Sequence, residues 1–197
     1  MRLADLTGLV MPVISDPMLE ITGLTADSRD VRPGYLFAAL PGAQDDGARY
    51  ISDAIARGAV ALLVTPQIAA KCARNPKDAQ VPLLTDINPR RLYAQLVAHY
   101  YGEQSETLVA VTGTNGKTSV ADFCRQIWLR LARRAASIGT LGVIGKNVNI
   151  AIGEGHVHTT PPPEILYPVL AQLRHNGFSH VALEASSHGL AQYRLDG

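Results

Sequence analysis

The sequence predicts an α/β fold built around mostly parallel sheets. Short apolar runs alternate with helical patterns along the chain, as expected when strands and helices follow one another. The clearest case is a strand, a glycine-rich loop and an amphipathic helix between residues 108 and 131. The 197 residues are 47% hydrophobic and carry 18 basic against 17 acidic side chains. Such a chain can bury a sizeable core, and its balanced charge argues against long contacts with nucleic acids or anionic membranes.

The first half of the chain contains three expected strands and two expected helices. They lie, in order, at residues 19–22 (strand), 50–57 (helix), 59–64 (strand), 81–84 (strand) and 88–101 (helix). A glycine after the first helix is a stop signal, and the run 59–64 is apolar enough for a buried strand. The composition then turns polar after Gly102. We therefore expect two domains, residues 1–104 and 105–197.

The second domain should continue the alternation. Its expected elements are a strand at 108–111, the helix after the glycine loop, a strand at 136–140, a hairpin within 142–155, a helix at 164–176 and a strand at 180–184. Three consecutive prolines precede Glu164, and proline suits the first turn of a helix but not its interior. The sequence thus predicts that strands and helices alternate in the second domain as well.

The helix after the loop should bury one face. Apolar residues recur in it at three- and four-residue steps, which is the pattern of an amphipathic helix packed on a sheet. They are Val120, Phe123, Cys124, Ile127 and Leu131.

The loop between strand and helix has the residue types of a phosphate-binding site. Glycines at 113 and 116 let backbone N–H groups turn inward, and the helix that follows adds the partial positive charge of its N-terminus. Lys117 adds a full charge for β- and γ-phosphates, and Thr118 a hydroxyl for Mg²⁺. Val111 stands where the general pattern G-x-x-x-x-G-K-[ST] has its first glycine, so the match to that pattern is partial.

Glu184 ends the last expected strand, where open α/β sheets bind their ligands. Its carboxylate is a candidate magnesium ligand, and the alternative is a solvated acid at a strand end. His156 and His158 are either metal ligands or a solvated pair. Ser186, Ser187 and His188 invite a hydrolase interpretation, but no Gly-x-Ser-x-Gly elbow surrounds them. The turn at residues 25–29 can offer amides and a guanidinium to a phosphate or uracil, or be an ordinary turn.

Compartment signals favour the cytoplasm. Cys72 and Cys124 have no metal-ligand spacing and indicate reduced thiols. Asp5 lies where a signal peptide has its apolar run, and no apolar stretch reaches the ~18 residues of a membrane span. The expected protein is cytoplasmic and has no membrane or nucleic-acid partner.

The chain resembles the Mur ligases in motifs that follow one another in order. They are Asp27-Ser28-Arg29, Pro33-Gly34-Tyr35-Leu36-Phe37, Asp46-Gly47, the glycine loop preceded by Val111, Thr159-Thr160-Pro161 and Glu184-Ala185-Ser186-Ser187-His188-Gly189-Leu190. The resemblance covers the chain from about residue 20, and the glycine loop with valine is the family's own form. The Ser-Ser-His-Gly-Leu run, with Gln192 and Arg194 behind it, is similar to the motif of the members that add the third amino acid of the peptide.

The resemblance implies an ATP- and Mg²⁺-dependent amide ligase of peptidoglycan synthesis, acting as a monomer. Its small-molecule substrates would be ATP, UDP-MurNAc-L-Ala-D-Glu and an amino acid, diaminopimelate or lysine. The γ-phosphoryl group of ATP would activate the D-Glu carboxylate as an acyl phosphate, which the amine then attacks. Both steps build negative charge that Lys117 and Mg²⁺ are placed to stabilise, so the enzyme works mainly by positioning and electrostatics.

The resemblance also assigns residues by position. ATP would lie on Gly113, Thr114, Asn115, Gly116, Lys117, Thr118 and Ser119, with Lys117 as the catalytic cation. UDP would lie against Ala26, Ser28, Ala43, Gln44 and Asp45. The muramoyl-dipeptide would contact His158, Thr159, Thr160, Ser186, Gln192 and Arg194, and magnesium would be held by Thr118 and Glu184. His158 stands where the family is expected to have Asn.

Other functions stay open at this point. One is another Mur-type ligase or a folylpolyglutamate-type ligase. A second is a GTPase or small-molecule kinase, although the Asn-Lys-x-Asp motif of GTPases is absent from the sequence. A third is a UDP-sugar-binding module without catalysis. The motif order leads us to expect a whole UDP-binding domain followed by the first part of a larger ATP-binding domain, so that this chain by itself binds ligands weakly and does not ligate.

Overall fold

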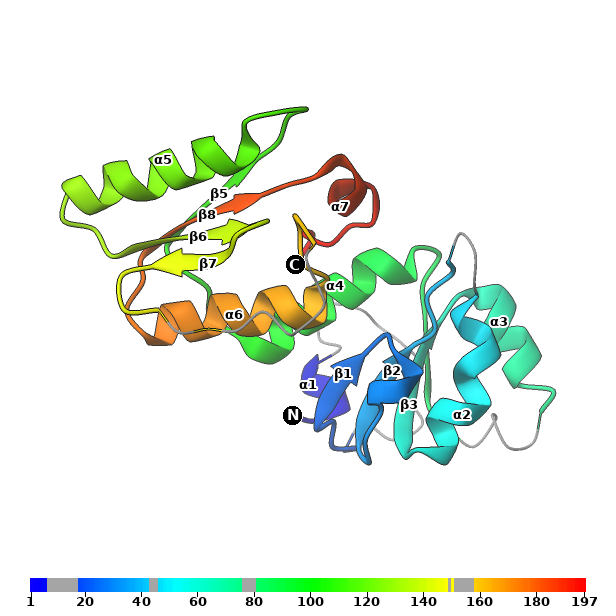
Figure 1. Ribbon diagram of the computed structural model, residues 1–197. Helices are drawn as coiled ribbons and strands as arrows, with labels where there is room; N and C mark the ends of the chain where they lie inside the picture. The colour runs from blue at the N-terminus through cyan, green and yellow to red at the C-terminus, as the bar shows by residue number, and fades with distance from the viewer. Residues whose placement is uncertain (7–17, 43–45, 76–80, 149, 151–157) are drawn as a thin grey trace. The chain divides into compact units, whose positions relative to one another are not determined.

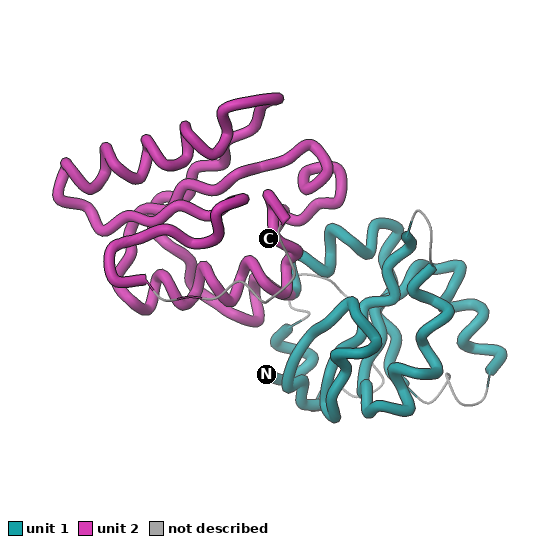
Figure 2. The backbone as a smooth tube through the Cα atoms, in the orientation of Figure 1, with its two compact units in different colours: residues 1–96 teal, residues 97–197 magenta. Residues whose placement is uncertain are grey.

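The computed structural model describes residues 1–6, 18–42, 46–75, 81–148, 150 and 158–197. The chain forms two compact units, residues 1–96 and 97–197 (Figure 2), and each contains one four-stranded sheet. The boundary between the two units lies inside helix α4 (Pro89–Tyr101). The domain boundary expected between residues 104 and 105 stays a prediction. None of the helices in these ranges is long and apolar enough to cross a bilayer.

The sheet of the first unit is parallel throughout, in the order β1-β2-β3-β4 (Figure 1). Its strands are β1 (Gly23–Thr25), β2 (Tyr35–Ala38), β3 (Ala59–Val64) and β4 (Leu83–Thr85). The strand expected at 19–22 is wrong. Residues 19 and 21 form their backbone hydrogen bonds with residues 3 and 1, so pairing with β2 begins only at Gly23.

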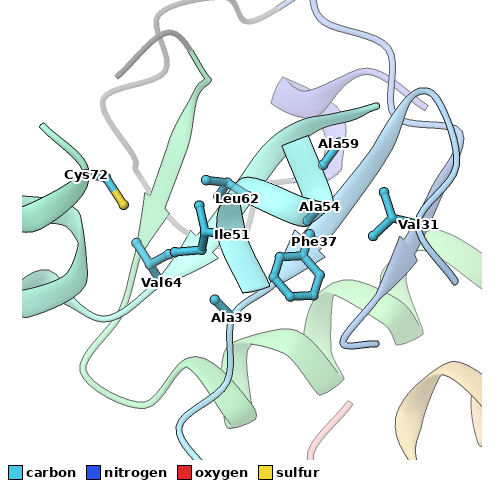
Figure 3. Close-up of a cluster of buried hydrophobic side chains, with 9 residues drawn as sticks. All are labelled: Val31, Phe37, Ala39, Ile51, Ala54, Ala59, Leu62, Val64 and Cys72. Atoms are coloured by element: carbon cyan, nitrogen blue, oxygen red, sulfur yellow. The ribbon is translucent and has the colours of Figure 1, made fainter. Parts of the chain in front are cut away.

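Three short helices accompany this sheet: α1 (Leu3–Leu6), α2 (Ile51–Ala56) and α3 (Pro66–Cys72). Helix α3 begins at Pro66 because two local features favour a helix start there. Thr65 Oγ1 accepts a hydrogen bond from Ile68 N, and proline suits the first helical position. One cluster of buried side chains, drawn in Figure 3, joins α2 and α3 to β2 and β3. It consists of Val31, Phe37, Ala39, Ile51, Ala54, Ala59, Leu62, Val64 and Cys72.

The sheet of the second unit has the order β5-β8-β6-β7. Its strands are β5 (Thr107–Val111), β6 (Ala135–Gly139), β7 (Gly142–Gly145) and β8 (His180–Glu184). All pairs are parallel except β6 with β7, which form the hairpin of this unit. The hairpin expected within 142–155 is therefore misplaced, because its first strand is β6; residues 149 and 151–157 lie outside the described residues. The predicted α/β class with mostly parallel sheets is confirmed.

Helices α5 (Lys117–Arg130) and α6 (Pro163–His175) lie on opposite faces of this sheet (Figure 1), and a short helix α7 (Ser187–Ala191) follows β8. Pro163 starts α6 as expected. Pro168, however, lies inside the helix, where proline is normally unfavourable. An internal proline removes one backbone donor. The buried side chains of α6 offset that loss: Pro163, Leu166, Tyr167, Val169, Leu170 and Leu173.

The buried face predicted for α5 is wrong. Val120, Phe123, Ile127 and Leu131 are 46–65% exposed, and Ala121 is the buried residue of this helix. Ala121 packs with Val111 and Ala182, and Cys124 and Trp128 lie partly buried beside them. The helix is amphipathic as predicted, but its contact with the sheet runs through Ala121, Cys124 and Trp128, of which only Cys124 belongs to the predicted stripe.

Candidate functional site

The glycine loop lies between β5 and α5, where the sequence places it. Gly113 and Gly116 have φ angles of +146° and +79°, and residues that carry a side chain rarely adopt either value. Gly116 is the residue before the first turn of α5, so the loop leads directly into the helix N-terminus. Residues 112–116 are exposed, while Lys117 and Thr118 are half-buried. This arrangement presents backbone amides and a helix dipole to an anion.

Lys117 lies across the loop. Its ammonium donates to the carbonyl oxygens of Gly113, at 2.8 Å, and Thr114, at 3.3 Å. These contacts fix the side chain beside the backbone amides that a phosphate would meet. The cation is therefore already positioned at the loop.

Glu184 is brought next to the loop by strand pairing. It ends β8 directly opposite Val111, the last residue of β5, and is only 3% exposed. A cavity of about 10 Å³, room for roughly one water-sized group, is lined by both Thr118 and Glu184. The two residues predicted as magnesium ligands thus line the same small cavity.

The carboxylate of Glu184 is held by the residue after β6. Thr140 N donates to Oε1 at 2.9 Å, and Thr140 Oγ1 lies 3.4 Å from Oε2 and 3.2 Å from Thr159 Oγ1. A Cβ at Gly139 would overlap the carboxylate of Glu184, so a side chain there would push the carboxylate out of its position. Sequence reasoning missed both residues. Their one signal was a position at the end of an expected strand.

Four of the residues expected to contact the muramoyl-dipeptide, Thr160, Ser186, Gln192 and Arg194, form one hydrogen-bond network. Thr160 Oγ1 donates to the carbonyl of Glu184 at 2.8 Å, accepts from Ser186 N at 2.8 Å and lies 3.1 Å from Ser186 Oγ. Ser186 Oγ in turn accepts from Gly189 N at 3.0 Å and so caps α7. Both hydroxyls therefore stabilise the chain around the end of β8.

Arg194 belongs to the same network. Its Nη1 donates to the carbonyl of Thr160 at 2.5 Å, and Nη2 and Nε donate to Gln192 Oε1 at 2.8 and 3.2 Å. Arg194 is 9% exposed, and Thr160 is 1% exposed. His158 and His188 are exposed, and Ser186 is engaged as a helix cap rather than paired with His188. The hydrolase interpretation therefore gains no support.

The metal-binding groups near the loop are oxygens. Among the residues that the structure describes, no three His, Cys, Asp or Glu side chains converge. Thr118, Asp122 and Glu184 line the same small cavity, and the carboxylate of Asp122 is engaged by Arg125 and Gln126. Each oxygen of Glu184 keeps acceptor capacity beyond its contact with Thr140. Hard oxygen donors of this kind suit Mg²⁺, whose remaining positions are commonly filled by water and phosphate.

A separate pocket of about 540 Å³ lies in the first unit. Its lining residues come from the turn after β1, the segment after β2 and the start of α4: Ala26, Asp27, Ser28, Arg29, Leu40, Gly42, Gly47, Tyr50 and Arg90. The turn is fixed locally, since Asp27 Oδ1 accepts from Arg29 N at 2.9 Å and Thr25 Oγ1 from Asp27 N at 3.0 Å. Ala26 and Ser28, both predicted UDP contacts, line this pocket. Ala43, Gln44 and Asp45 lie outside the described residues.

Two family models match this chain. The model described as "Mur ligase family, catalytic domain" matches residues 20–101, and the model described as "Mur ligase middle domain" matches residues 111–197.

Curated relatives match along the whole chain. Three of them carry the name UDP-N-acetylmuramoyl-L-alanyl-D-glutamate--2,6-diaminopimelate ligase. The protein of Rhizobium meliloti is 45% identical over 203 residues, that of Mesorhizobium japonicum 47% over 199, and that of Brucella melitensis 49% over 179. These alignments cover 100%, 100% and 91% of this chain. The chain spans 40%, 39% and 35% of these relatives' lengths.

Solved structures agree on the fold. A structure titled UDP-N-acetylmuramoyl-L-alanyl-D-glutamate--2,6-diaminopimelate ligase superposes with a TM-score of 0.76 at 25% identity, over 100% of this chain and 38% of that one. A structure of MurF from Acinetobacter baumannii gives a TM-score of 0.51 at 22% identity, over 85% of this chain and 31% of that one. Together with the two family models, these matches show that the chain belongs to the Mur ligase family.

Proposed function

We propose that this chain supplies the UDP-binding and ATP-binding groups of a ligase that extends UDP-MurNAc-L-Ala-D-Glu by one amino acid. The observation that carries the proposal is the glycine loop with Lys117, next to Glu184 at the carboxyl ends of β5 and β8. The names of the relatives add the incoming amino acid, 2,6-diaminopimelate. The proposal includes ATP and Mg²⁺ as cofactors, a cytoplasmic monomer, and neither nucleic acid nor membrane as partner.

The chemistry needs an activated carboxylate, because a carboxylate anion is a poor electrophile. Transfer of the γ-phosphoryl group of ATP to the D-Glu carboxylate forms a P–O bond to that carboxylate and breaks the bond to the β-phosphate, with ADP as leaving group. The amine then attacks the acyl phosphate and releases inorganic phosphate. In both steps negative charge grows on oxygens, and a cation fixed close to them lowers the barrier.

Residues of this chain fit those demands. The ammonium of Lys117 would exchange its carbonyl contacts for phosphate oxygens, and the loop amides would hold the phosphates in place. Thr118 and Glu184 would hold Mg²⁺, which when bound shields the charge of the phosphates. Thr140 keeps the Glu184 carboxylate in its orientation. Thr159, Thr160, Ser186, Gln192, Arg194 and His158 remain proposed substrate contacts.

The experiment is a calorimetric titration of the chain with Mg·ATP and, separately, with UDP-MurNAc-L-Ala-D-Glu. Both should bind. The variant Lys117→Ala should weaken ATP binding about 10- to 100-fold, the worth of charge-assisted hydrogen bonds, and leave binding of the UDP-linked substrate unchanged. Lys146→Ala, which removes a lysine at the end of β7, is the matched control and should bind both as the wild type does.

Three outcomes would contradict the proposal. Unchanged ATP affinity in Lys117→Ala would refute the proposal that Lys117 and its loop bind the phosphates of ATP. Binding of a folate or of a longer muramoyl-peptide in place of the dipeptide would point to another ligase of this type, and a preference for GTP over ATP would point to a nucleotide switch.

A further inference from the structure

The pocket in the first unit is lined by two arginines with different electrostatic surroundings. Arg29 forms a bidentate ion pair with Asp27, with Nε 2.9 Å from Oδ1 and Nη2 2.5 Å from Oδ2. Its side chain is 82% exposed. The charge of Arg29 is therefore largely neutralised and in contact with water.

Arg90 is half-buried and has a neutral partner. Its Nη2 donates to the carbonyl oxygen of Pro41 at 2.6 Å, and in the described ranges no carboxylate forms an ion pair with it. Burial lowers the pKa of Arg90, without an opposing acidic group to raise it. A guanidinium stays charged even so. Its positive charge is thus partly shielded from water, and no acidic side chain among the described residues balances it.

The position of Arg90 along α4 adds to this imbalance. It is the second residue of a 13-residue helix whose first turn contains no acid. The helix dipole places partial positive charge at that end, so a cation there is unfavourable. An anion in the pocket would relieve both the burial of the guanidinium and its repulsion by the helix end. The contact with Pro41 also leaves most of the five N–H donors of the guanidinium available.

We infer that Arg90 binds the diphosphate of the UDP-linked substrate in this pocket. The inference rests on the proposed function, which brings a UDP group to the pocket, and assigns a residue that the family resemblance does not include. A diphosphate carries the compensating charge, and its planar pairs of oxygens match the fork of a guanidinium. Arg29 is the less suitable cation because a phosphate would have to compete with Asp27 for it.

A different role for Arg90 makes a different prediction. The contact with Pro41 could serve to support the segment after β2, and then Arg90 would affect every ligand of the pocket alike. The variant Arg90→Gln separates the two roles, since its amide can still donate to the Pro41 carbonyl but carries no charge. Uridine and UDP are the matched probes, because they differ only in the diphosphate.

The experiment titrates the chain with uridine and with UDP and follows backbone amide shifts by NMR, which also verify that each variant is folded. Wild type should bind UDP more tightly than uridine. Arg90→Gln should lose about 10- to 100-fold in UDP affinity, as expected for charge-assisted contacts, and keep its uridine affinity. Arg90→Lys should recover part of the loss. Arg91→Gln, a change at the neighbouring exposed arginine outside the pocket lining, should behave as wild type.

Each other outcome overturns the inference. Equal losses for uridine and UDP would assign Arg90 to support of the pocket wall, and unchanged UDP affinity in Arg90→Gln would remove it from binding altogether. In both cases the proposed function stands. A wild-type chain that binds neither UDP nor UDP-MurNAc-L-Ala-D-Glu would overturn the proposed function together with the inference.

Discussion

Helices α5 and α6 flank the same sheet, yet only one of them buries its large apolar side chains. Leu170 and Leu173 of α6 are 1% and 0% exposed, whereas Phe123 and Ile127 of α5 are 58% and 56% exposed. Both helices show the three- and four-residue spacing of apolar residues that predicts an amphipathic helix. Spacing therefore predicts where the apolar stripe lies on a helix, but burial depends on what packs against that stripe.

The largest expected effect compares the same substitution on the two faces. Leu173→Ala should lower the free energy of unfolding of the second unit by about 2–5 kcal/mol, because it removes buried contacts and leaves a cavity. Leu131→Ala, at a residue 65% exposed just after α5, should change it by less than about 0.5 kcal/mol. Urea unfolding followed by the fluorescence of Trp128, the single tryptophan, measures both. Equal losses would mean that the α5 stripe is buried in solution.

A second effect concerns the hydroxyl group of Tyr167, which is buried on α6. Burial raises the pKa of Tyr167 to about 12, above its ordinary value of 10. The folded state thus favours the neutral phenol, so stability is complete below pH 10 and falls as the pH rises from 10 to 12. The two-unit shift corresponds to at most about 3 kcal/mol. Stability curves of wild type and Tyr167→Phe should diverge in this window, and parallel curves would contradict the prediction.

The smallest effect is expected at the ends of the hairpin between β6 and β7. Gly139→Ala would put a Cβ against the carboxylate of Glu184 and should reduce Mg·ATP affinity about tenfold. Gly142→Ala has nothing within 4 Å but strains a backbone with φ +82°, so it should cost about 1–2 kcal/mol of stability and leave Mg·ATP affinity unchanged. Calorimetric titration with Mg·ATP distinguishes the two. A loss in both variants would remove Gly139 from the site.

Local signals explain what could be predicted from the sequence. The strand, glycine loop and helix around Lys117 are contiguous, so one short motif specifies them, and Glu184 could be assigned from its place at the end of an apolar run. The bounds of α2, α4 and α6 were likewise predicted to within one residue, whereas α1, α3 and α7 were not predicted. These features depend on neighbours along the chain, and such neighbours are visible in a sequence.

Tertiary contacts explain what could not be predicted. Thr140 reaches Glu184 across 44 positions of sequence, and no motif links them. Arg90 faces the segment after β2 across 49 positions, and its incomplete charge balance is visible only once burial is known. Residues 19–22 failed as a strand because the N-terminal residues compete for their backbone hydrogen bonds. The exposure of Phe123 likewise depends on packing partners that periodicity does not reveal.

The contacts of Lys117 with Gly113 and Thr114 have a consequence for how tightly nucleotides bind. The ammonium acts as an internal ligand of its own loop, so a phosphate gains it only by exchange for two carbonyl oxygens. The measured affinity then reflects the hydrogen bonds of Lys117 to phosphate minus those to the two carbonyl oxygens. The lysine side chain is already ordered before binding, so binding costs little further rotamer entropy. If the loop binds a nucleotide as proposed, it exchanges some strength of binding for a cation that already lies beside the phosphate position.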